Sequence, residues 1–152
     1  MSGFEPVDPG YADRIRDSFA RQSVMQLIGA RLTRIEPGFC EIELPWRADL
    51  CQQHGYVHAG ITTAIADSAG GYAAFSLFPA DSSVLTVEYK INLVSPAEGE
   101  RLVATGRVTK PGSTITVCEL EVVAFKGGRA KTCAVGLQTM MCLHGRPDRP
   151  AL

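Results

Sequence analysis

Residues Gln52 to Phe78 read QQHGYVHAGITTAIADSAGGYAAFSLF, a loop-like start that leads into the longest helix-compatible run of the chain. Small and apolar side chains recur there at helical spacing and form one continuous face: Ile61, Ala64, Ile65, Ser68, Ala69 and Tyr72. Side chains of this size favour close packing of the helix against a sheet. A single charged residue, Asp67, interrupts the segment. Because burying a carboxylate is costly unless it is hydrogen-bonded, Asp67 is a candidate functional residue.

The start of this helix is a candidate site for negative charge. If the helix begins near Ala59, its first backbone N–H groups have no partner within the helix and carry partial positive charge. Such groups suit an anion or an oxyanion. Asp67 lies about two turns further on, roughly 10 Å along the axis, which is too far for one substrate carbonyl to meet both groups. A second copy of the helix running antiparallel would bring them together, so the sequence predicts a dimer.

Length and composition limit the class of protein. The 152 residues are 45% hydrophobic and 20% charged, as expected for one globular domain. A net charge of −1 without a basic stripe argues against nucleic acid as a partner, and no apolar run approaches the ~20 residues that span a bilayer. The N-terminus lacks the apolar core of a secretory signal, and the five scattered cysteines contain no C-x-x-C pair. We therefore predict a cytoplasmic protein with no membrane partner.

The remaining segments predict one further helix and six strands. Residues 1–24 form an N-terminal extension with a short amphipathic helix, expected over Tyr11–Met25. The strands Ile28–Ile35 and Phe39–Trp46 flank a Glu-Pro-Gly turn and are expected to form a hairpin. After the central helix, period-2 patterns predict an antiparallel meander of four strands: 84–94, Arg101–Lys110, Thr114–Phe125 and Arg129–Met141.

This order of elements predicts an α+β fold in which a curved antiparallel sheet wraps around one long central helix. The domain is expected over residues 25–142, followed by a mobile tail over residues 143–152. In the strand at 84–94, strict alternation places Thr86 on the same face as Glu88 and opposite Val87. The same strand offers an edge for pairing with a second copy of the chain.

Several motifs add a family resemblance. The segment GYVHAG at 55–60 followed by ADSA at 66–69 resembles the hotdog-fold acyl-CoA thioesterases of the phenylacetate-pathway, PaaI-like type. That family has the motif H-G-G followed, roughly eight or nine residues later, by an acidic residue on the central helix; here His58-Ala59-Gly60 precedes Asp67. The turns SPAEGE at 95–100 and KPG at 110–112 also resemble the family. The likeness covers about residues 25–142.

The resemblance implies a role for individual residues. Asp67 would act as general base or nucleophile on the thioester or its attacking water, and the backbone N–H groups at Ala59 and Gly60 would form the oxyanion hole. Gln52 would orient the leaving thiolate or a water, and Thr86 would hold the hydrolytic water. Further contacts to the substrate are expected from His58, His54, Gln53, Gly55, Ser68 and Lys110. No metal and no cofactor are implied, because coenzyme A is part of the substrate.

Other side chains have ordinary structural interpretations. For His58 we favour a ring that hydrogen-bonds to the backbone and fixes the loop before the helix over a general base. Cys51, His54 and His58 lack a fourth metal ligand at comparable spacing. Most cations of the later strands are expected on solvated faces, with one or two available to coenzyme A phosphates: Lys90, Arg107, Lys110 and Lys131. The core or the acyl-pocket wall is the expected place of Tyr72, Phe75 and Phe78.

We therefore expect an enzyme that hydrolyses acyl-CoA thioesters, assembled as a homodimer or a dimer of dimers. Two alternatives stay open. A non-catalytic acyl-binding or regulatory hotdog module would be stabilised by ligand without turnover. A hotdog enoyl-CoA hydratase or dehydratase would need a catalytic histidine and acid at other places than His58 and Asp67 on one helix.

Overall fold

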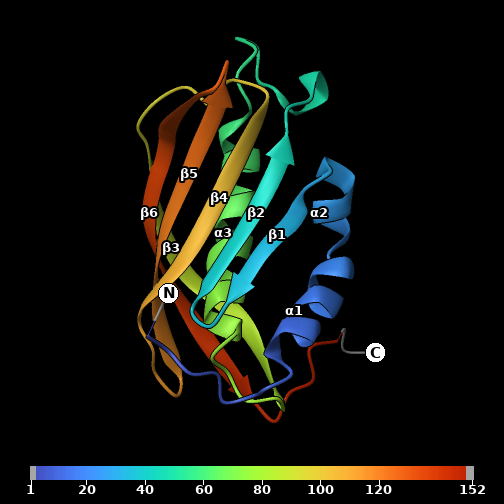
Figure 1. Ribbon diagram of the computed structural model, residues 1–152, viewed down its shortest axis with the longest axis vertical. Coiled ribbons are helices and arrows are strands. Elements are labelled where there is room, and N and C mark those ends of the chain that lie inside the picture. The colour runs from blue at the N-terminus through green and yellow to red at the C-terminus, as the bar shows by residue number, and fades with distance from the viewer. Residues whose placement is uncertain (1–2, 150–152) are drawn as a thin grey trace.

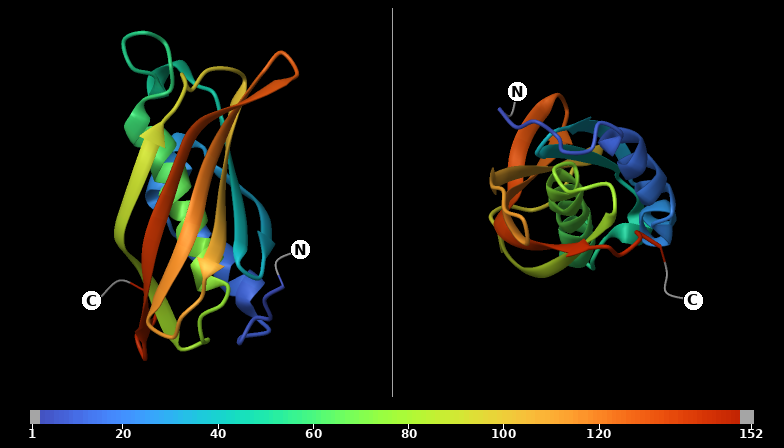
Figure 2. Two further views of the ribbon diagram at one scale, coloured as in Figure 1. Left: turned by 90° about the vertical axis from the view of Figure 1, so that its left-hand side faces the viewer. Right: turned by 90° about the horizontal axis from the view of Figure 1, so that it is seen from below.

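The computed structural model describes residues 3–149 and shows one sheet curved around one helix (Figure 1). The helices are α1 (Tyr11–Ala20), α2 (Ser23–Ile28), the short 3-10 helix η1 (Ala48–Leu50) and α3 (Ala59–Phe75). The strands are β1 (Arg31–Glu36), β2 (Phe39–Pro45), β3 (Ser82–Leu93), β4 (Arg101–Lys110), β5 (Ile115–Lys126) and β6 (Arg129–His144). Viewed from one end, α3 lies inside the curve of the sheet, and α1 and α2 lie to one side of it (Figure 2). Among the described residues, no helix is both long and apolar enough to cross a membrane.

The six strands form one antiparallel sheet in the order β1-β2-β4-β5-β6-β3. This confirms the predicted α+β fold with a curved antiparallel sheet around a central helix. The predicted four-strand meander is wrong in one respect: only β4, β5 and β6 are sequential neighbours, and β3 pairs with β6. The reason is that β3 follows α3 and returns along it, on the side away from β1 and β2 (Figure 2). As a result β3 lies at an edge of the sheet.

The predicted helix over Tyr11–Met25 is two helices, because Gln22 between α1 and α2 is extended (φ −76°, ψ 92°). The second helix then runs past the predicted end and stops before Gly29, whose φ of 79° is accessible to glycine at low cost. The predicted strand Ile28–Ile35 therefore begins about three residues later, at Arg31. The central helix also ends earlier than the quoted stretch, at its sixteenth residue after Ala59.

The central helix lies against the sheet at a position where no side chain separates them. A Cβ atom at Gly106 of β4 would lie 2.4 Å from backbone atoms of Ala69 and Gly70 on α3. Because those atoms belong to the backbone, no rotamer change could relieve the overlap, so the site requires glycine. Every residue from Ser68 to Phe75 is buried. The second half of α3 is thus enclosed on all sides, although the sequence indicated one apolar face.

A β-bulge in β3 changes which side chains face the helix. The register with β6 shifts between Thr86, which pairs with Met140, and Glu88, which pairs with Thr139. The extra residue, Val87, lets Thr86 point toward α3 while Glu88 points to the outer face and bonds Thr139. The strict alternation predicted for this strand is therefore wrong at this point. The bulge brings a hydroxyl group to the helix side of the sheet.

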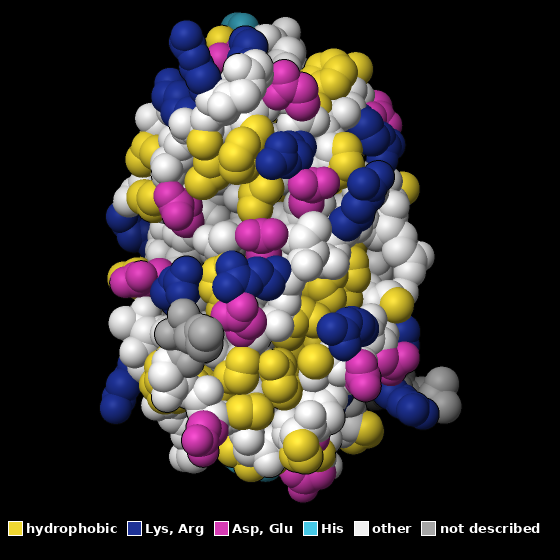
Figure 3. Space-filling model, in the orientation of Figure 1, with side chains coloured by type: hydrophobic (Ala, Val, Ile, Leu, Met, Phe, Trp, Pro, Cys, Tyr) yellow, Lys and Arg dark blue, Asp and Glu magenta, His cyan; other side chains and the backbone are white. Residues whose placement is uncertain are grey.

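The outer face of the sheet carries charges of both signs. Figure 3 shows lysine and arginine side chains interspersed with aspartate and glutamate over this face, with apolar side chains between them. Arg34 and Arg107 lie over the ring of Phe39, 4.9 and 4.8 Å from its centroid. Opposite charges mixed in this way do not form a single-sign field over the face that is shown.

Arg14 on α1 ties the N-terminal extension to the end of the central helix. Its Nη1 donates to the carbonyl of Pro79 at 2.6 Å, and its Nη2 donates to the carbonyls of Phe75 and Phe78 at 3.2 and 2.8 Å. The Nε group lies 3.2 Å from the carboxylate of Asp8. Burial lowers the pKa of Arg14, but the guanidinium stays charged. The side chain therefore pairs carbonyl groups at the C-terminus of α3, where positive charge is favourable.

We expect Arg14→Met to lower the free energy of unfolding by about 2–4 kcal/mol, because it leaves the carbonyl of buried Phe78 without a donor and Asp8 without its cationic partner. Urea denaturation measures this value. Arg16→Met is the control on the same helix: Arg16 and Asp13 form an ion pair with side chains 62% and 92% exposed. Its loss should change stability by about 0.5 kcal/mol or less. Similar losses of stability for the two variants would show that Arg14 does not anchor the N-terminal extension to the end of α3.

Candidate active site

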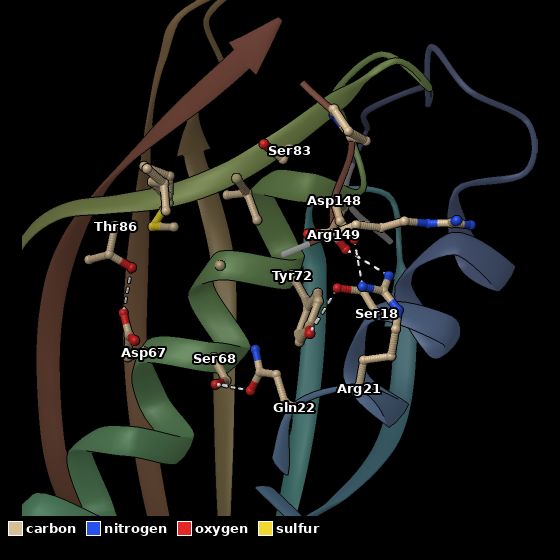
Figure 4. Close-up of a pocket in the computed structure, with 15 residues that line it drawn as sticks. Ser18, Arg21, Gln22, Asp67, Ser68, Tyr72, Ser83, Thr86, Asp148 and Arg149 are labelled. Atoms are coloured by element: carbon tan, nitrogen blue, oxygen red, sulfur yellow. Dashed lines mark hydrogen bonds and ion pairs between the residues drawn. The ribbon is translucent and has the colours of Figure 1, made fainter. Parts of the chain in front are cut away.

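Asp67 lies half-buried on α3, and its carboxylate accepts hydrogen bonds from side chains of the sheet. The hydroxyl group of Thr86 donates to Oδ1 at 2.7 Å, as Figure 4 shows. The side-chain amide of Gln138 donates to the same oxygen and, at 3.1 Å, to the backbone carbonyl of Asp67. Within residues 3–149 the other carboxylate oxygen, Oδ2, forms no hydrogen bond. One oxygen is therefore fixed, and the other is available for chemistry.

A cavity of about 410 Å³ opens beside Asp67, lined by α3, β3 and the N-terminal helices. Two pairs of polar side chains lie in its wall (Figure 4). The hydroxyl of Ser68 donates to the amide oxygen of Gln22 at 3.1 Å, and the hydroxyls of Ser18 and Tyr72 are 3.2 Å apart. Burial raises the pKa of Tyr72 to about 12, so its phenol stays protonated at neutral pH. The predicted contact residue Ser68 is thus placed beside Asp67, and Tyr72 is in the wall.

The C-terminal segment of the described chain closes one side of this cavity. Arg21 of α1 donates to the carbonyl and the carboxylate of Asp148, and the carboxylate contact is 3.1 Å long. Pro147 and Arg149 also line the cavity. Residues 143 and 144 of the expected tail belong to β6. The mobility of the remaining tail stays a prediction.

The N-terminus of α3 keeps one of the two expected oxyanion donors. His58 is the N-cap residue, and its ring Nδ1 accepts a hydrogen bond from the backbone N–H of Gly60 at 2.9 Å. This is the backbone hydrogen bond expected for His58. It occupies the Gly60 donor in this arrangement of the loop, and the role expected for Gly60 stays a prediction. The N–H of Ala59 has no partner in the described part of the chain and is the free donor.

Gln52 lies near this free donor. Its backbone N–H donates to the carbonyl of Tyr56 at 2.8 Å, and its side-chain oxygen accepts from the backbone N–H of His54. Its side-chain NH₂ group has no partner among residues 3–149. Gln52 and Ala59 line a second cavity of about 480 Å³, together with the end of β3. The structure therefore brings the expected donors for the leaving group and for the oxyanion together.

The other expected contact residues are distributed unevenly. His58 and Gln53 line the second cavity, whereas His54 and Gly55 are exposed at the tip of the loop and line neither cavity. Lys110 is the last residue of β4. Residues 111–113, which follow it, line a cavity together with residues 77–79, just after the C-terminus of α3. Lys110 is therefore at the opposite end of the helix from Ala59. Within one chain, Lys110 lines neither the cavity beside Asp67 nor the cavity beside Ala59.

The two groups of site residues are separate within the chain. The cavity beside Asp67 and the cavity beside Ala59 have no lining residue in common. The two residues belong to the same helix, more than two turns apart. Each cavity therefore holds half of the groups that a thioester reaction needs: a carboxylate in one, and the free amides in the other.

Comparison with known proteins identifies the family. The model of the thioesterase superfamily matches residues 54–131, about half of the chain, and this range includes Ala59, Asp67 and Thr86. The chain belongs to the thioesterase superfamily. Its fold and its motif residues agree with this membership.

Similar proteins support the same conclusion. The crystal structure of a thioesterase family protein from Silicibacter pomeroyi is 48% identical, with a TM-score of 0.88 over 90% of this chain and 100% of that one. The proofreading thioesterase EntH of Klebsiella pneumoniae is 28% identical over 109 residues, 72% of this chain and 80% of its own. The PaaI protein of E. coli, from the phenylacetic acid degradation operon, has the same fold, with a TM-score of 0.80 at 20% identity over 90% and 95% of the two chains. These findings confirm the hotdog fold and the PaaI-like resemblance, and they support thioester hydrolase activity.

Sequence reasoning missed two residues of this thioesterase that contact the site. Gln138 and Gln22 both lie outside the residues matched by the family model. For Gln138 a signal was present: it shares its strand face with Ala134, Gly136 and Met140, and is the polar exception in that row. For Gln22 no local pattern gave a signal, because its contact with Ser68 depends on the break between two helices.

We expect His58→Ala to destabilise the thioesterase by about 1 kcal/mol, because the Gly60 N–H loses its cap. His58→Asn should retain most of the stability, since an asparagine side chain at this position also accepts from the helix start. Thermal and urea unfolding of the two variants measure the difference. Equal stability of the alanine variant and the unmodified protein would show that the ring does not cap α3.

Proposed function

We propose that this thioesterase hydrolyses acyl-CoA thioesters to the free acid and coenzyme A, in a site shared by two copies of the chain. The observation that carries the proposal is the separation of Asp67 and the free Ala59 N–H into different cavities. One thioester carbonyl needs a base or nucleophile and an oxyanion donor, both about 3 Å from the reacting atoms. One chain does not supply both at one point, whereas an antiparallel second copy does.

The edge of the sheet supports this assembly. The strand β3 has twelve residues and lies at the edge, so one row of its backbone groups has no strand partner in the described chain. Large apolar side chains along and just after it are about half exposed: Val87, Tyr89, Leu93 and Val94. A long apolar edge of this kind promotes pairing with another strand unless it is covered. Pairing with the β3 of a second copy covers it.

The register of this pairing follows from the cavities. Leu93 and Val94 line the cavity of Ala59, whereas Val84 and Leu85 line the cavity of Asp67. Two β3 strands can pair antiparallel about a twofold axis near Tyr89. This pairing sets residues 93–94 of one chain opposite residues 84–85 of the other. The two α3 helices then run antiparallel. Each Ala59 N–H group thereby approaches the Asp67 of the partner chain.

The chemistry follows from these positions. Asp67 Oδ2 either takes a proton from a water that attacks the thioester carbon, or attacks that carbon itself to form an anhydride that water then hydrolyses. In both routes the carbonyl oxygen gains negative charge, which the Ala59 N–H of the partner chain stabilises. The C–S bond breaks as the carbonyl re-forms, and the Gln52 amide is placed to meet the leaving sulfur. The thiolate takes up a proton and leaves as coenzyme A.

The proposed role of Gln52 assigns the two parts of the substrate. Because its amide would meet the leaving sulfur, the coenzyme A portion extends past Gln52 along the second cavity. The acyl group then occupies the cavity of about 410 Å³ beside Asp67, which has room for a compact acyl group. The catalytic groups all come from the chain, so we propose a reaction without metal or cofactor. The described cysteines are all free thiols, which supports the proposed cytoplasmic location.

We expect Asp67→Asn to reduce kcat with short and aryl acyl-CoA substrates by about 10²–10⁴-fold, because the amide can neither accept the proton nor attack. Release of free thiol measures the rate. Asp17→Asn, on α1 and with a side chain 72% exposed, is the matched control and should keep full activity. Unchanged kcat in a folded Asp67→Asn variant would reject the proposal, and stabilisation by acyl-CoA without turnover in the unmodified protein would favour a binding module.

Mixing two inactive variants tests the shared site. Ala59→Pro removes only the free N–H, and proline is favoured at the first residue of a helix. Unfolding and refolding Asp67→Asn together with Ala59→Pro produces mixed dimers that contain one intact site. Activity should recover to about a quarter of the original value, since half of the dimers are mixed and each has one of two sites. No recovery, with mixed dimers demonstrated by mass spectrometry, would place both groups in one chain.

A further inference from the structure

Gln138 is a fully buried polar side chain beside Asp67 that the proposed chemistry does not yet use. It has 0% of its surface exposed and lies on β6, where its neighbours on the same face are apolar. A buried amide is costly unless its donors and its acceptor are all paired. An apolar residue of the same volume would fill this position without that cost.

The hydrogen bonds of Gln138 are directed at one residue. Its Nε2 donates to Oδ1 of Asp67 and to the backbone carbonyl of Asp67 at 3.1 Å, and it lies 3.4 Å from the hydroxyl of Thr86. Its own oxygen, Oε1, is buried and has no hydrogen-bond partner among residues 3–149. The donor side of this amide is therefore fully used and its acceptor side is not. Such an arrangement lowers stability and orders Asp67 at the same time.

Gly70 on α3 makes room for this amide. A Cβ atom at Gly70 would lie 1.8 Å from Oε1 of Gln138 and 2.6 Å from a methyl carbon of Leu120. A glycine in a helix interior costs roughly 0.5–1 kcal/mol relative to alanine. Gly70 leaves the space that Gln138 needs to reach Asp67, and the Oε1 atom of Gln138 stays buried without a partner among the described residues. Both features are unfavourable for stability. Unfavourable features of this kind are typical of functional sites.

We propose that Gln138 is a positioning residue: it holds Oδ1 of Asp67, together with Thr86, so that Oδ2 is the oxygen presented to the substrate. This inference rests on the proposed function, because it assigns the reacting oxygen of that site. A donor that binds both the carboxylate and the carbonyl of the same residue fixes the side-chain torsions between them. Fixed orientation matters because a displacement of about 1 Å at a reacting group can cost on the order of 10²-fold in rate.

Replacing Gln138 with Met tests the inference, since Met has similar volume and no donor. We expect kcat to fall by about 10- to 100-fold with KM changed by less than about twofold, because the acyl and coenzyme A contacts remain. The melting temperature should stay the same or rise, because the unpaired Oε1 is removed. A purely structural glutamine would give the opposite pattern, with lower stability and unchanged kcat. Thr116→Val is the control: Thr116 is also fully buried in the sheet, but it bonds to Gly112 outside both cavities.

Gln138→Glu separates a hydrogen-bond role from a packing role. Its carboxyl group donates only when protonated, so its kcat deficit relative to the unmodified protein should shrink as the pH falls from 8 toward 5. The deficit of Gln138→Met should not change in that range. Equal, pH-independent deficits in both variants, or full kcat in a folded Gln138→Met, would overturn the inference.

A crystal structure of Gln138→Met keeps this test separate from the test of the function. If Gln138 positions Asp67, the carboxylate should lose its single orientation in this variant, whether or not the protein hydrolyses a given thioester. An unchanged Asp67 rotamer would overturn the inference. Absence of turnover with any thioester in the unmodified protein would instead reject the proposed function and leave the orientation result to decide the inference.

Discussion

The close approach of α3 to the sheet determines how the site is built. Gly106 allows the backbone of the helix to lie on β4, and Gly70 leaves space for Gln138 from β6. At this separation, side chains of the sheet reach the polar groups of the helix directly. Asp67 is therefore held by the sheet, although it belongs to the helix. A bulkier residue at either glycine would move the helix outward and release the carboxylate from its donors.

The same helix presents two chemical groups that one molecule cannot use together. Its free N–H at Ala59 and its carboxylate at Asp67 lie in different cavities. The geometry of a helix fixes their separation, so no side-chain rotation can close it. In the proposed dimer, an antiparallel copy of the helix exchanges the positions of the two groups. The edge of β3, which has no strand partner among the described residues, supports this proposed symmetry.

The N-terminal helices add a wall to the sheet and its central helix, and they lie outside residues 54–131 that the family model matches. The break at Gln22 turns its amide toward Ser68, and Arg21 holds the C-terminal segment at Asp148. Arg14 anchors this whole extension to the end of α3. The cavity beside Asp67 thus depends on segments from both ends of the chain. Its polar wall is a property of this chain's extension as well as of the hotdog domain.

Sequence alone determined the features that depend on local pattern. Helical spacing of small residues located the central helix, and the lone charge within it marked Asp67 as a candidate functional residue. The turn before Phe39 predicted the first hairpin. Most strand bounds followed from period-2 alternation, because neighbouring residues set that pattern.

Only the tertiary structure decided the features that depend on contacts between distant residues. The pairing of β3 with β6, the bulge at Val87 and the position of Gln138 all require two strands to be aligned. The capture of the Gly60 N–H by His58 needed the actual loop conformation. A sequence pattern records which faces are apolar, but register and hydrogen-bond partners are set by the packing of segments far apart in the chain. For this reason the sequence singled out Asp67 as the candidate acid, and the fold determined which side chains hold it.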